Sequence, residues 1–267
     1  MNYRAFFGLT RDPFAADLAL DAILKTKDLT AVHERIGYTV GLGAIALVTG
    51  EVGAGKSTAL RWVAGQFHPS RYKILWVTAT SGSILEIYRQ LLAELDVHSA
   101  SSSRAILTGQ IRSQIINLVQ TRKQQPVLII DEASLLRLDV FAELHTLTQF
   151  EGDSKPYLPM ILAGQNNLAD NLLYRTAVPL ASRIVARSHL QEVNREGMER
   201  YLDHHLKIAG LKQSPFDSQA ITAIHQGSGG LFRKANHLAR GALLAAAGET
   251  SQVVTAEHVR LASTELF

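Results

Sequence analysis

Residues 50–57 read GEVGAGKS and limit what this chain can fold into more than any other stretch of its 267 residues. They fit the pattern G-x-x-x-x-G-K-[ST], with an apolar run at 44–48 before it and a helix-like run at 58–64 after it. Between a strand and a helix, such a loop turns backbone N–H groups toward a phosphate, and the positive end of the helix adds to the field. The pattern therefore predicts an α/β fold with a phosphate-binding loop.

The loop also predicts which side chains meet a nucleoside triphosphate. Lys56 is long enough to reach the β- and γ-phosphates, and the Ser57 hydroxyl is a ligand for Mg²⁺. The expected ligand is ATP or GTP, and we take ATP and Mg²⁺ as the cofactors. A glycine-rich turn that carries a lysine by chance is the alternative. The expected nucleotide contacts are Gly50, Val52, Gly53, Ala54, Gly55, Lys56, Ser57 and Thr58.

A second apolar run, Val127–Ile130, ends in two acids, Asp131 and Glu132. An aspartate at the carboxyl end of a strand beside the phosphate loop can hold Mg²⁺, often through water. Glu132 can then polarise the attacking water as a general base. A strand followed by the polar start of a helix would show the same residues, and this alternative stays open.

A third apolar run, Ile161–Ala163, is followed by Gly164, Gln165 and Asn166. If its strand lies between the other two, it aims Gln165 or Asn166 at the γ-phosphate or at the attacking water. We prefer Gln165, because it is the first polar side chain past the strand.

Three arginines are candidates for contacts with nucleotide. Arg183 precedes the last expected strand and could act as an arginine finger on the γ-phosphate of a neighbouring subunit, with Arg175 as the rival. For either residue, an ordinary surface ion pair is the alternative. Arg233 begins a C-terminal helix and could reach back to the nucleotide, or could simply be solvated there.

Apolar runs alternate with helical patterns up to residue 190, which is typical of a parallel sheet covered by helices. Five strands are expected at 44–49, 74–79, 127–131, 159–163 and 184–187, with helices between them at 56–66, 84–95, 105–122, 135–150 and 168–174. From residue 194 on, only helices are expected, at 195–209, 218–225, 231–247 and 256–266. His204 and His205 should form an exposed pair on one of them.

These patterns predict an α/β class fold with a central parallel five-stranded sheet and a small C-terminal helical lid. The expected domains are a nucleotide-binding domain over 1–190, in which residues 1–40 form an N-terminal extension, and a helical lid over 191–267. The chain has no cysteine, which excludes disulfides and cysteine-bound zinc. No apolar run approaches the roughly 20 residues that cross a bilayer, and no signal peptide begins the chain. We expect a cytoplasmic protein without a membrane contact.

The net charge is only +3, but its distribution is uneven. Residues 52–130 hold nine Lys/Arg and three acids, a balance that favours contact with a nucleic acid. Arginines that merely solvate helix faces would give the same count. Contacts would be mostly to DNA phosphates, hence tolerant of sequence and sensitive to salt. The candidate DNA contacts are Thr80, Ser81, Arg104, Arg112, Arg122 and Lys123.

The motifs together resemble those of the AAA+ ATPases: the phosphate loop, the Asp131–Glu132 and Gln165 strand ends, Arg183, and the G-x-x-R at 230–233. The start, YRAFFGLTRDPF at residues 3–14, is similar to the FFGL…PF start of the ExeA/GspA-like ATPases, as are residues 49–57 and 163–165. The resemblance implies hydrolysis of ATP to ADP and phosphate. It also implies ATP-dependent self-assembly into a ring or helical filament, with Arg183 acting on a neighbour and Arg233 coupling the lid.

The resemblance implies two settings. In secretion, members of the family carry this ATPase module ahead of a membrane helix and a peptidoglycan-binding domain. This sequence ends at Phe267 with neither, so we expect it to resemble the stand-alone ATPase subunits of transposons, of the TnsC, TniB, IstB and MuB type. Those proteins bind duplex DNA and present a target to a transposase. The alternatives are a secretion-assembly ATPase without DNA and a nucleotide-gated scaffold in which turnover is incidental.

Overall fold

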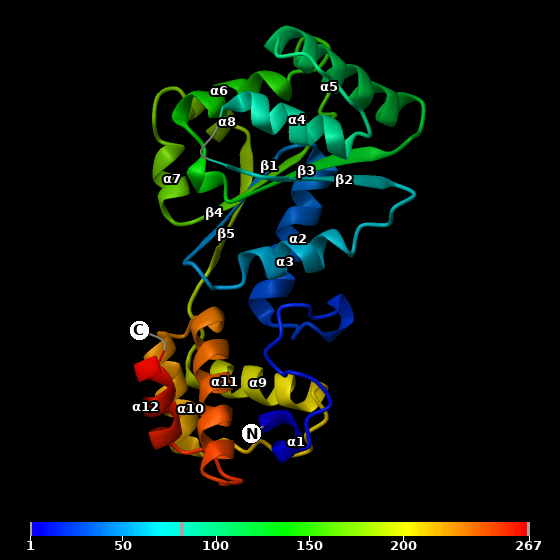
Figure 1. Ribbon diagram of the computed structural model, residues 1–267. Coiled ribbons are helices and arrows are strands. Elements are labelled where there is room, and N and C mark those ends of the chain that lie inside the picture. Colours follow the sequence, from blue (N-terminus) through cyan, green and yellow to red (C-terminus); the bar gives the residue numbers. More distant parts are fainter. Residues whose placement is uncertain (1, 81–82, 266–267) are drawn as a thin grey trace. The chain divides into compact units, whose positions relative to one another are not determined.

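The computed structural model describes residues 2–80 and 83–265 (Figure 1). Its residues fall into two units by their contacts. The sheet unit comprises Thr26–Gly50 and Lys56–Leu190, and the helical unit comprises Met1–Lys25, Glu51–Gly55 and Gln191–Phe267. The division after Leu190 lies where the strand-like pattern of the sequence stops.

The sheet unit is built on five parallel strands in the order β2-β3-β4-β1-β5. The expected five-stranded parallel sheet is therefore confirmed, and β4 lies between β1 and β3. The apolar runs form strands because their side chains are buried on both faces. The strands are β1 Ile45–Gly50, β2 Tyr72–Thr78, β3 Gln125–Asp131, β4 Met160–Gly164 and β5 Ile184–Leu190.

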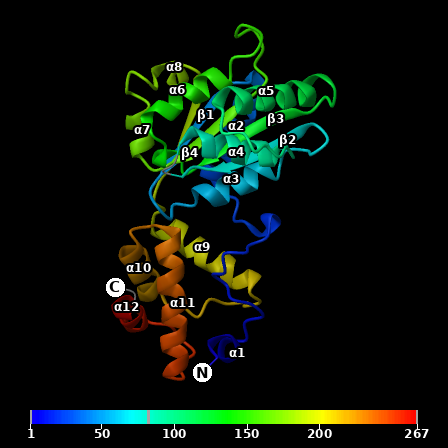
Figure 2. The same ribbon diagram turned by 45° about the horizontal axis from the view of Figure 1, so that its top comes forward.

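Helices cover both faces of this sheet. In Figures 1 and 2, α2 and α3 lie on one face, and α4, α5, α6 and α8 lie on the other. In α5 the apolar residues Leu107, Ile111, Ile115 and Leu118 recur with the helical period and are all buried. The helices are α2 Lys27–Leu42, α3 Lys56–Ala64, α4 Ile84–Glu94, α5 Arg104–Gln120, α6 Leu138–Leu147, α7 Asn167–Asn171 and α8 Val178–Ala181.

The segment after β3 is not the single helix that the sequence predicts over 135–150. A short 3₁₀ turn, η2 Ala133–Leu135, comes first, and α6 begins only at Leu138. Leu136 and Arg137 have extended backbone, with ψ of 139° and 149°, and this separates the two elements. Glu132, just before η2, has a left-handed backbone with φ 55°.

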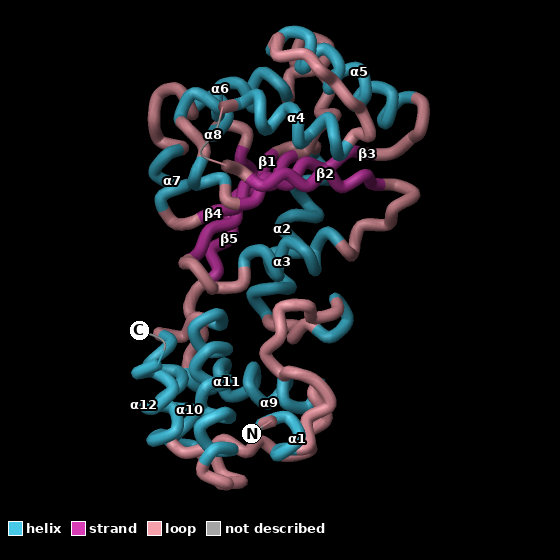
Figure 3. Tube along the Cα trace, in the orientation of Figure 1, coloured by secondary structure: helices cyan, strands magenta, loops and turns pink. Residues whose placement is uncertain are grey.

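The helical unit contains α1 Tyr3–Phe7, η1 Leu20–Ala22, α9 Arg195–Ile208, α10 Ser218–Ser228, α11 Phe232–Gly248 and α12 Ala256–Glu265. Figure 3 shows that helices and loops make up this unit, as the sequence predicts after residue 190. Within its described residues, the only strand-like pairing is an isolated bridge between Phe216 and Val254. No helix in the described part of the chain is both long enough and apolar enough to cross a membrane.

The first 25 residues belong to the helical unit, whereas the sequence analysis placed them with the nucleotide-binding domain. Phe7, Leu9 and Phe14, from the FFGL…PF start, are buried in the core that α9, α10 and α11 form. Gly8 ends α1 with a φ of 72°, a left-handed cap that turns the chain. The sequence shows that these side chains are apolar, but their spacing does not indicate in which of the two hydrophobic cores they are buried.

Polar contacts fix the same segment to α9 and α11. Arg240 Nε donates to Asp12 Oδ2 at 2.9 Å, and its Nη2 donates to the Phe14 carbonyl at 2.6 Å. His205 Nδ1 lies 2.7 Å from the Pro13 carbonyl and donates to it in the Nδ1–H tautomer. The N-terminal start is therefore an integral part of the helical unit.

The expectation that His204 and His205 form an exposed pair is wrong. His205 is buried on the face of α9 that also holds Met198, Leu202 and Leu206, because these positions share one side of the helix. His204 is half-buried, and its Nε2 lies 2.7 Å from the carbonyl of Ala22.

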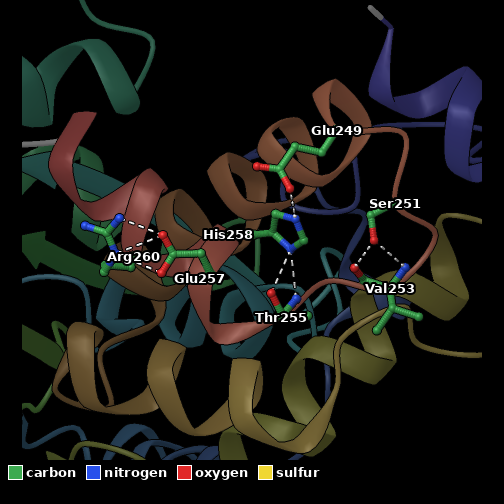
Figure 4. Close-up of polar contacts among 7 residues, drawn as sticks. All are labelled: Glu249, Ser251, Val253, Thr255, Glu257, His258 and Arg260. Atoms are coloured by element: carbon green, nitrogen blue, oxygen red, sulfur yellow. Dashed lines mark hydrogen bonds and ion pairs between the residues drawn. The ribbon is translucent and has the colours of Figure 1, made fainter.

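A buried histidine also fixes the last helix. His258 Nδ1 accepts a hydrogen bond from Thr255 N at 2.9 Å, and its Nε2 lies 3.1 Å from Glu249 Oε2 (Figure 4). The first contact satisfies a backbone donor just before α12, and the second ties α12 to the residue that ends α11.

Candidate nucleotide-binding and catalytic site

The phosphate loop joins β1 to α3, as the sequence predicts. Gly53 and Gly55 have φ of 88° and 95°, a region that residues with a Cβ rarely adopt. Ala54 N donates to the Glu51 carbonyl at 3.1 Å and closes the turn. The two glycines are therefore needed for the path of the backbone, which is the cradle that a phosphate requires.

Lys56 lies at the base of this loop. It is 6% exposed, and its Nζ donates to the Gly50 carbonyl at 2.8 Å. Ser57 and Thr58 are exposed in the first turn of α3. A buried ammonium beside an exposed hydroxyl and the N-terminus of a helix suits a polyphosphate with its Mg²⁺, so the residues present fit these cofactors.

The acids stand at the carboxyl end of β3. Asp131 is 7% exposed, and its Oδ1 accepts from Glu132 N at 2.9 Å. The Asp131 carbonyl accepts from Ala79 N at 2.8 Å, which fixes the strand end on the side of β2. Neighbouring strands lie about 5 Å apart, so the ends of β3 and β1 are separated by about 10 Å across β4.

Gln165 follows β4 and lies between these two strand ends. It is half-buried, and its backbone N donates to Ser134 Oγ at 3.2 Å. Asn166 is exposed and precedes α7. The preference for Gln165 over Asn166 stays a prediction. Ser134 was not among the sequence candidates; its place two residues after Glu132 was the available signal.

Arg183 lies at the opposite edge of the sheet. It precedes β5 at the amino end, where its carbonyl accepts from Ile45 N at 3.1 Å. The length of β1, about 20 Å at 3.3 Å per residue, separates this edge from the phosphate loop. The structure therefore does not bring Arg183 to the site of its own sheet unit.

A local ion pair also holds Arg183. Its Nη2 lies 2.6 Å from both carboxylate oxygens of Asp153, and this contact lowers the pKa of Asp153. His145 is close by, and burial together with the charge of Arg183 lowers its pKa. The rival, Arg175, is exposed between α7 and α8. Asp153 is a residue that the sequence analysis missed, because the partners lie 30 positions apart.

Arg233 meets the tip of the phosphate loop, which groups with the helical unit. Its backbone N donates to the Gly53 carbonyl at 3.3 Å, and a Cβ on Gly53 would lie 2.9 Å from the Arg233 Cβ. The Arg233 side chain is exposed in the first turn of α11. Arg233 thus contacts the loop through its backbone. A side chain at Gly53 would be too close to Arg233 without a shift of one of the two segments.

Comparison with known proteins agrees with this geometry. Residues 41–172 match the family model described as the AAA domain. This stretch is similar to an AAA domain. It is also 29% identical, over 267 residues, to "General secretion pathway protein A" of Aeromonas hydrophila, with 99% of this chain and 48% of that protein covered. The chain thus spans about half the length of this curated relative, and the resemblance drawn from the FFGL…PF start is confirmed.

Solved structures extend the likeness to the helical unit. Cdc6p from Pyrobaculum aerophilum has a TM-score of 0.77 and 15% identity, covering 97% of this chain and 72% of that one. The Aeropyrum pernix ORC1 protein in complex with DNA has a TM-score of 0.70 and 16% identity, covering 95% and 68%. At such identities the likeness shows the fold alone, which is the P-loop AAA+ fold with a helical C-terminal part.

Two of the candidate DNA contacts already have partners within the sheet unit. Arg104 pairs with Glu143 at 2.9 Å. Arg112 donates to the carbonyls of Thr146 and Gln149 near the end of α6, and its guanidinium lies 4.6 Å from the Phe150 ring centre. Both arginines therefore hold α5 against α6.

The remaining candidates divide between two edges of the sheet. Thr80 follows β2 at the carboxyl edge and donates to Glu86 Oε2. Arg122 and Lys123 are exposed at the amino edge, between α5 and β3. Among the described residues neither forms an ion pair. Ser81 lies outside the described residues.

Proposed function

We propose that this protein binds ATP with Mg²⁺ and hydrolyses it to ADP and phosphate. One observation carries the proposal: β1, β4 and β3 are adjacent, so that Lys56 with Ser57, Gln165, and Asp131 with Glu132 follow three neighbouring strand ends. Mg²⁺ would neutralise phosphate charge beside Ser57 and Asp131. The match of residues 41–172 to the AAA domain model supports the same chemistry.

Each of these residues has a distinct task in the proposed reaction. Lys56 places a buried positive charge beside the β- and γ-phosphates, where charge develops as the terminal phosphoryl group leaves. Glu132 accepts a proton from the water that attacks the γ-phosphorus, and the bridging oxygen leaves with ADP. Gln165 hydrogen-bonds the γ-phosphate or that water. Glu132 and Gln165 thus approach the reaction from neighbouring strands.

The position of Arg183 supports an assembly of several copies. Because Arg183 lies about 20 Å along the sheet from its own phosphate loop, it can contribute only to a neighbour's site. We propose that the ATP-bound protein forms a ring or helical filament in which Arg183 leaves Asp153 for that phosphate. Arg233, whose backbone contacts the loop tip, would report the nucleotide state to the helical unit.

A finer proposal assigns duplex DNA as the partner. The basic composition of residues 52–130 supports it, and the similar ORC1 structure is described as a complex with DNA. Arg122 and Lys123 are the candidate contacts that remain exposed and without an ion pair in the described chain. In this proposal the cytoplasmic assembly regulates transposition, selecting a target for a transposase.

A second candidate function is favoured by a specific observation. The relative that matches 99% of this chain is named for the general secretion pathway. In that case the ATPase would work on an assembly partner of protein and would be indifferent to DNA. A nucleotide-gated scaffold is the third candidate, in which binding alone suffices.

Turnover measured with and without duplex DNA separates these candidates. We expect DNA to stimulate ATP hydrolysis at low salt and to promote growth of particles with a slowly hydrolysed ATP analogue. Arg122→Ala/Lys123→Ala should weaken DNA binding. It should also reduce the slope of log K against log salt concentration by up to about two, because each cation contacts about one phosphate. Arg137→Ala/Lys212→Ala, which removes two other exposed charges, is the matched control. Hydrolysis that ignores DNA, with no assembly on it, would favour the secretion-type ATPase.

Glu132→Gln distinguishes hydrolysis-driven release from gating. If hydrolysis releases the protein, this variant should bind ATP and accumulate on DNA. If binding alone is the function, the variant should retain the full activity of the wild type.

A further inference from the structure

Ser134 connects the strand ends on either side of the proposed γ-phosphate position. It lies in η2, two residues after Glu132, and is 7% exposed. Its Oγ accepts the hydrogen bond from Gln165 N at 3.2 Å. A small buried hydroxyl thus joins the segment after β3 to the segment after β4.

The Gln165 N–H has no partner in the sheet. The pairing of β4 with β1 ends at Gly164, and its pairing with β3 ends at Leu162. A backbone donor beyond both ladders needs another acceptor when water is excluded. Ser134 Oγ is that acceptor, and it therefore fixes the point from which the Gln165 side chain extends.

The two segments also touch through their backbones. A Cβ on Gly164 would lie 2.7 Å from Ser134 N and 3.0 Å from Ser134 Oγ. In turn, η2 is joined to Glu132, whose carbonyl accepts from Leu135 N at 2.9 Å. A displacement of Glu132 would therefore move Ser134, and Ser134 would move Gln165.

We propose that Ser134 is a positioning residue that couples Gln165 to the Asp131–Glu132 strand end. Through it, Gln165 meets the γ-phosphate or the attacking water only while Glu132 is in place. The inference rests on the proposed ATPase function. Ser134 touches no reacting atom and acts through Gln165 alone.

The test compares the affinities for ATP and ADP in Glu132→Gln protein, where turnover does not interfere. Ser134→Ala should lower the preference for ATP over ADP by roughly 2- to 12-fold, the value of one net hydrogen bond. With Gln165→Ala also present, Ser134→Ala should change the ratio no further. Without Glu132→Gln, it should lower kcat/KM for ATP by at least a similar factor.

Two further variants keep the result independent of folding. Ser188→Ala removes another buried serine that holds a hydrogen bond, the one from Arg35, and should leave the ratio unchanged. Gly164→Ala disturbs the same contact from the other side and should lower the ratio only where Gln165 is intact. Melting temperatures of all variants identify any that unfold.

Two results would overturn the proposal. One is an unchanged ratio in folded Ser134→Ala protein, and the other is the same reduction with and without Gln165. Failure of the proposed function looks different: the chain with intact Gln165 would then show no preference for ATP, and Gln165→Ala would have no effect.

Discussion

Arg240→Ala should loosen the N-terminal segment from the helical unit. The guanidinium makes two charge-assisted contacts, to Asp12 at 2.9 Å and to the Phe14 carbonyl at 2.6 Å. The side chains of Arg240 and Asp12 are half-buried, with exposed fractions of 30% and 29%. Because this ion pair is intermediate between exposed and buried pairs, we expect Arg240→Ala to lower the free energy of unfolding by about 2–3 kcal/mol. The coupling to Asp12 accounts for about 1 kcal/mol of this loss.

The assay is urea unfolding followed by circular dichroism, with amide hydrogen exchange over residues 3–25. Single and double variants of Arg240 and Asp12 form a thermodynamic cycle that isolates the coupling. Arg260→Ala is the matched control, because its ion pair with Glu257 in α12 is exposed and should contribute nothing measurable. If Arg240→Ala leaves both stability and exchange unchanged, the N-terminal segment does not depend on this contact.

Three further perturbations test other contacts. Burial lowers the pKa of His205, so the contribution of this neutral side chain to folding stability should be complete above its ordinary pKa of about 6.5 and decline as the pH falls through the lower, folded value. In urea unfolding, His205→Gln should therefore lose less stability than the wild type between pH 7 and 5. Equal losses would refute this. His258→Ala should cost about 1–2 kcal/mol by releasing Thr255 N, with faster amide exchange at the start of α12; unchanged exchange there would contradict the role. Asp153→Asn should reach its full ATPase rate at lower protein concentration, because Arg183 is then available to a neighbour, and an unchanged concentration profile would count against an arginine finger.

The strands and the phosphate loop were predictable because local sequence determines them. A buried parallel strand such as β3 is a continuous apolar run, and a left-handed turn such as the one at Gly53 and Gly55 calls for glycine. The polar residues at the ends of three such strands follow the same edge of the sheet, because parallel strands share one carboxyl edge.

The remaining features depend on contacts between distant residues. Arg104 pairs with a glutamate 39 positions away, so composition alone made it a DNA candidate. Glu132 has a left-handed backbone just before the break between η2 and α6. Because this residue is not a glycine, the sequence does not indicate such a conformation. Phe7 and Phe14 are recognisably apolar, but the sequence does not specify that the helical unit buries them.

The central claim is that the three adjacent strand ends hydrolyse ATP. The most direct measurement is the steady-state rate of phosphate release with Mg²⁺-ATP for the wild type, Lys56→Ala, Glu132→Gln and Lys73→Ala. Loss of a general base lowers a rate by about 10²–10⁴-fold, so Glu132→Gln should fall by that factor while Lys73→Ala, whose exposed ion pair with Asp96 lies away from the loop, stays at the wild-type rate. Lys56→Ala should lose both nucleotide binding and turnover. Turnover that persists in Lys56→Ala and Glu132→Gln would contradict the site described here.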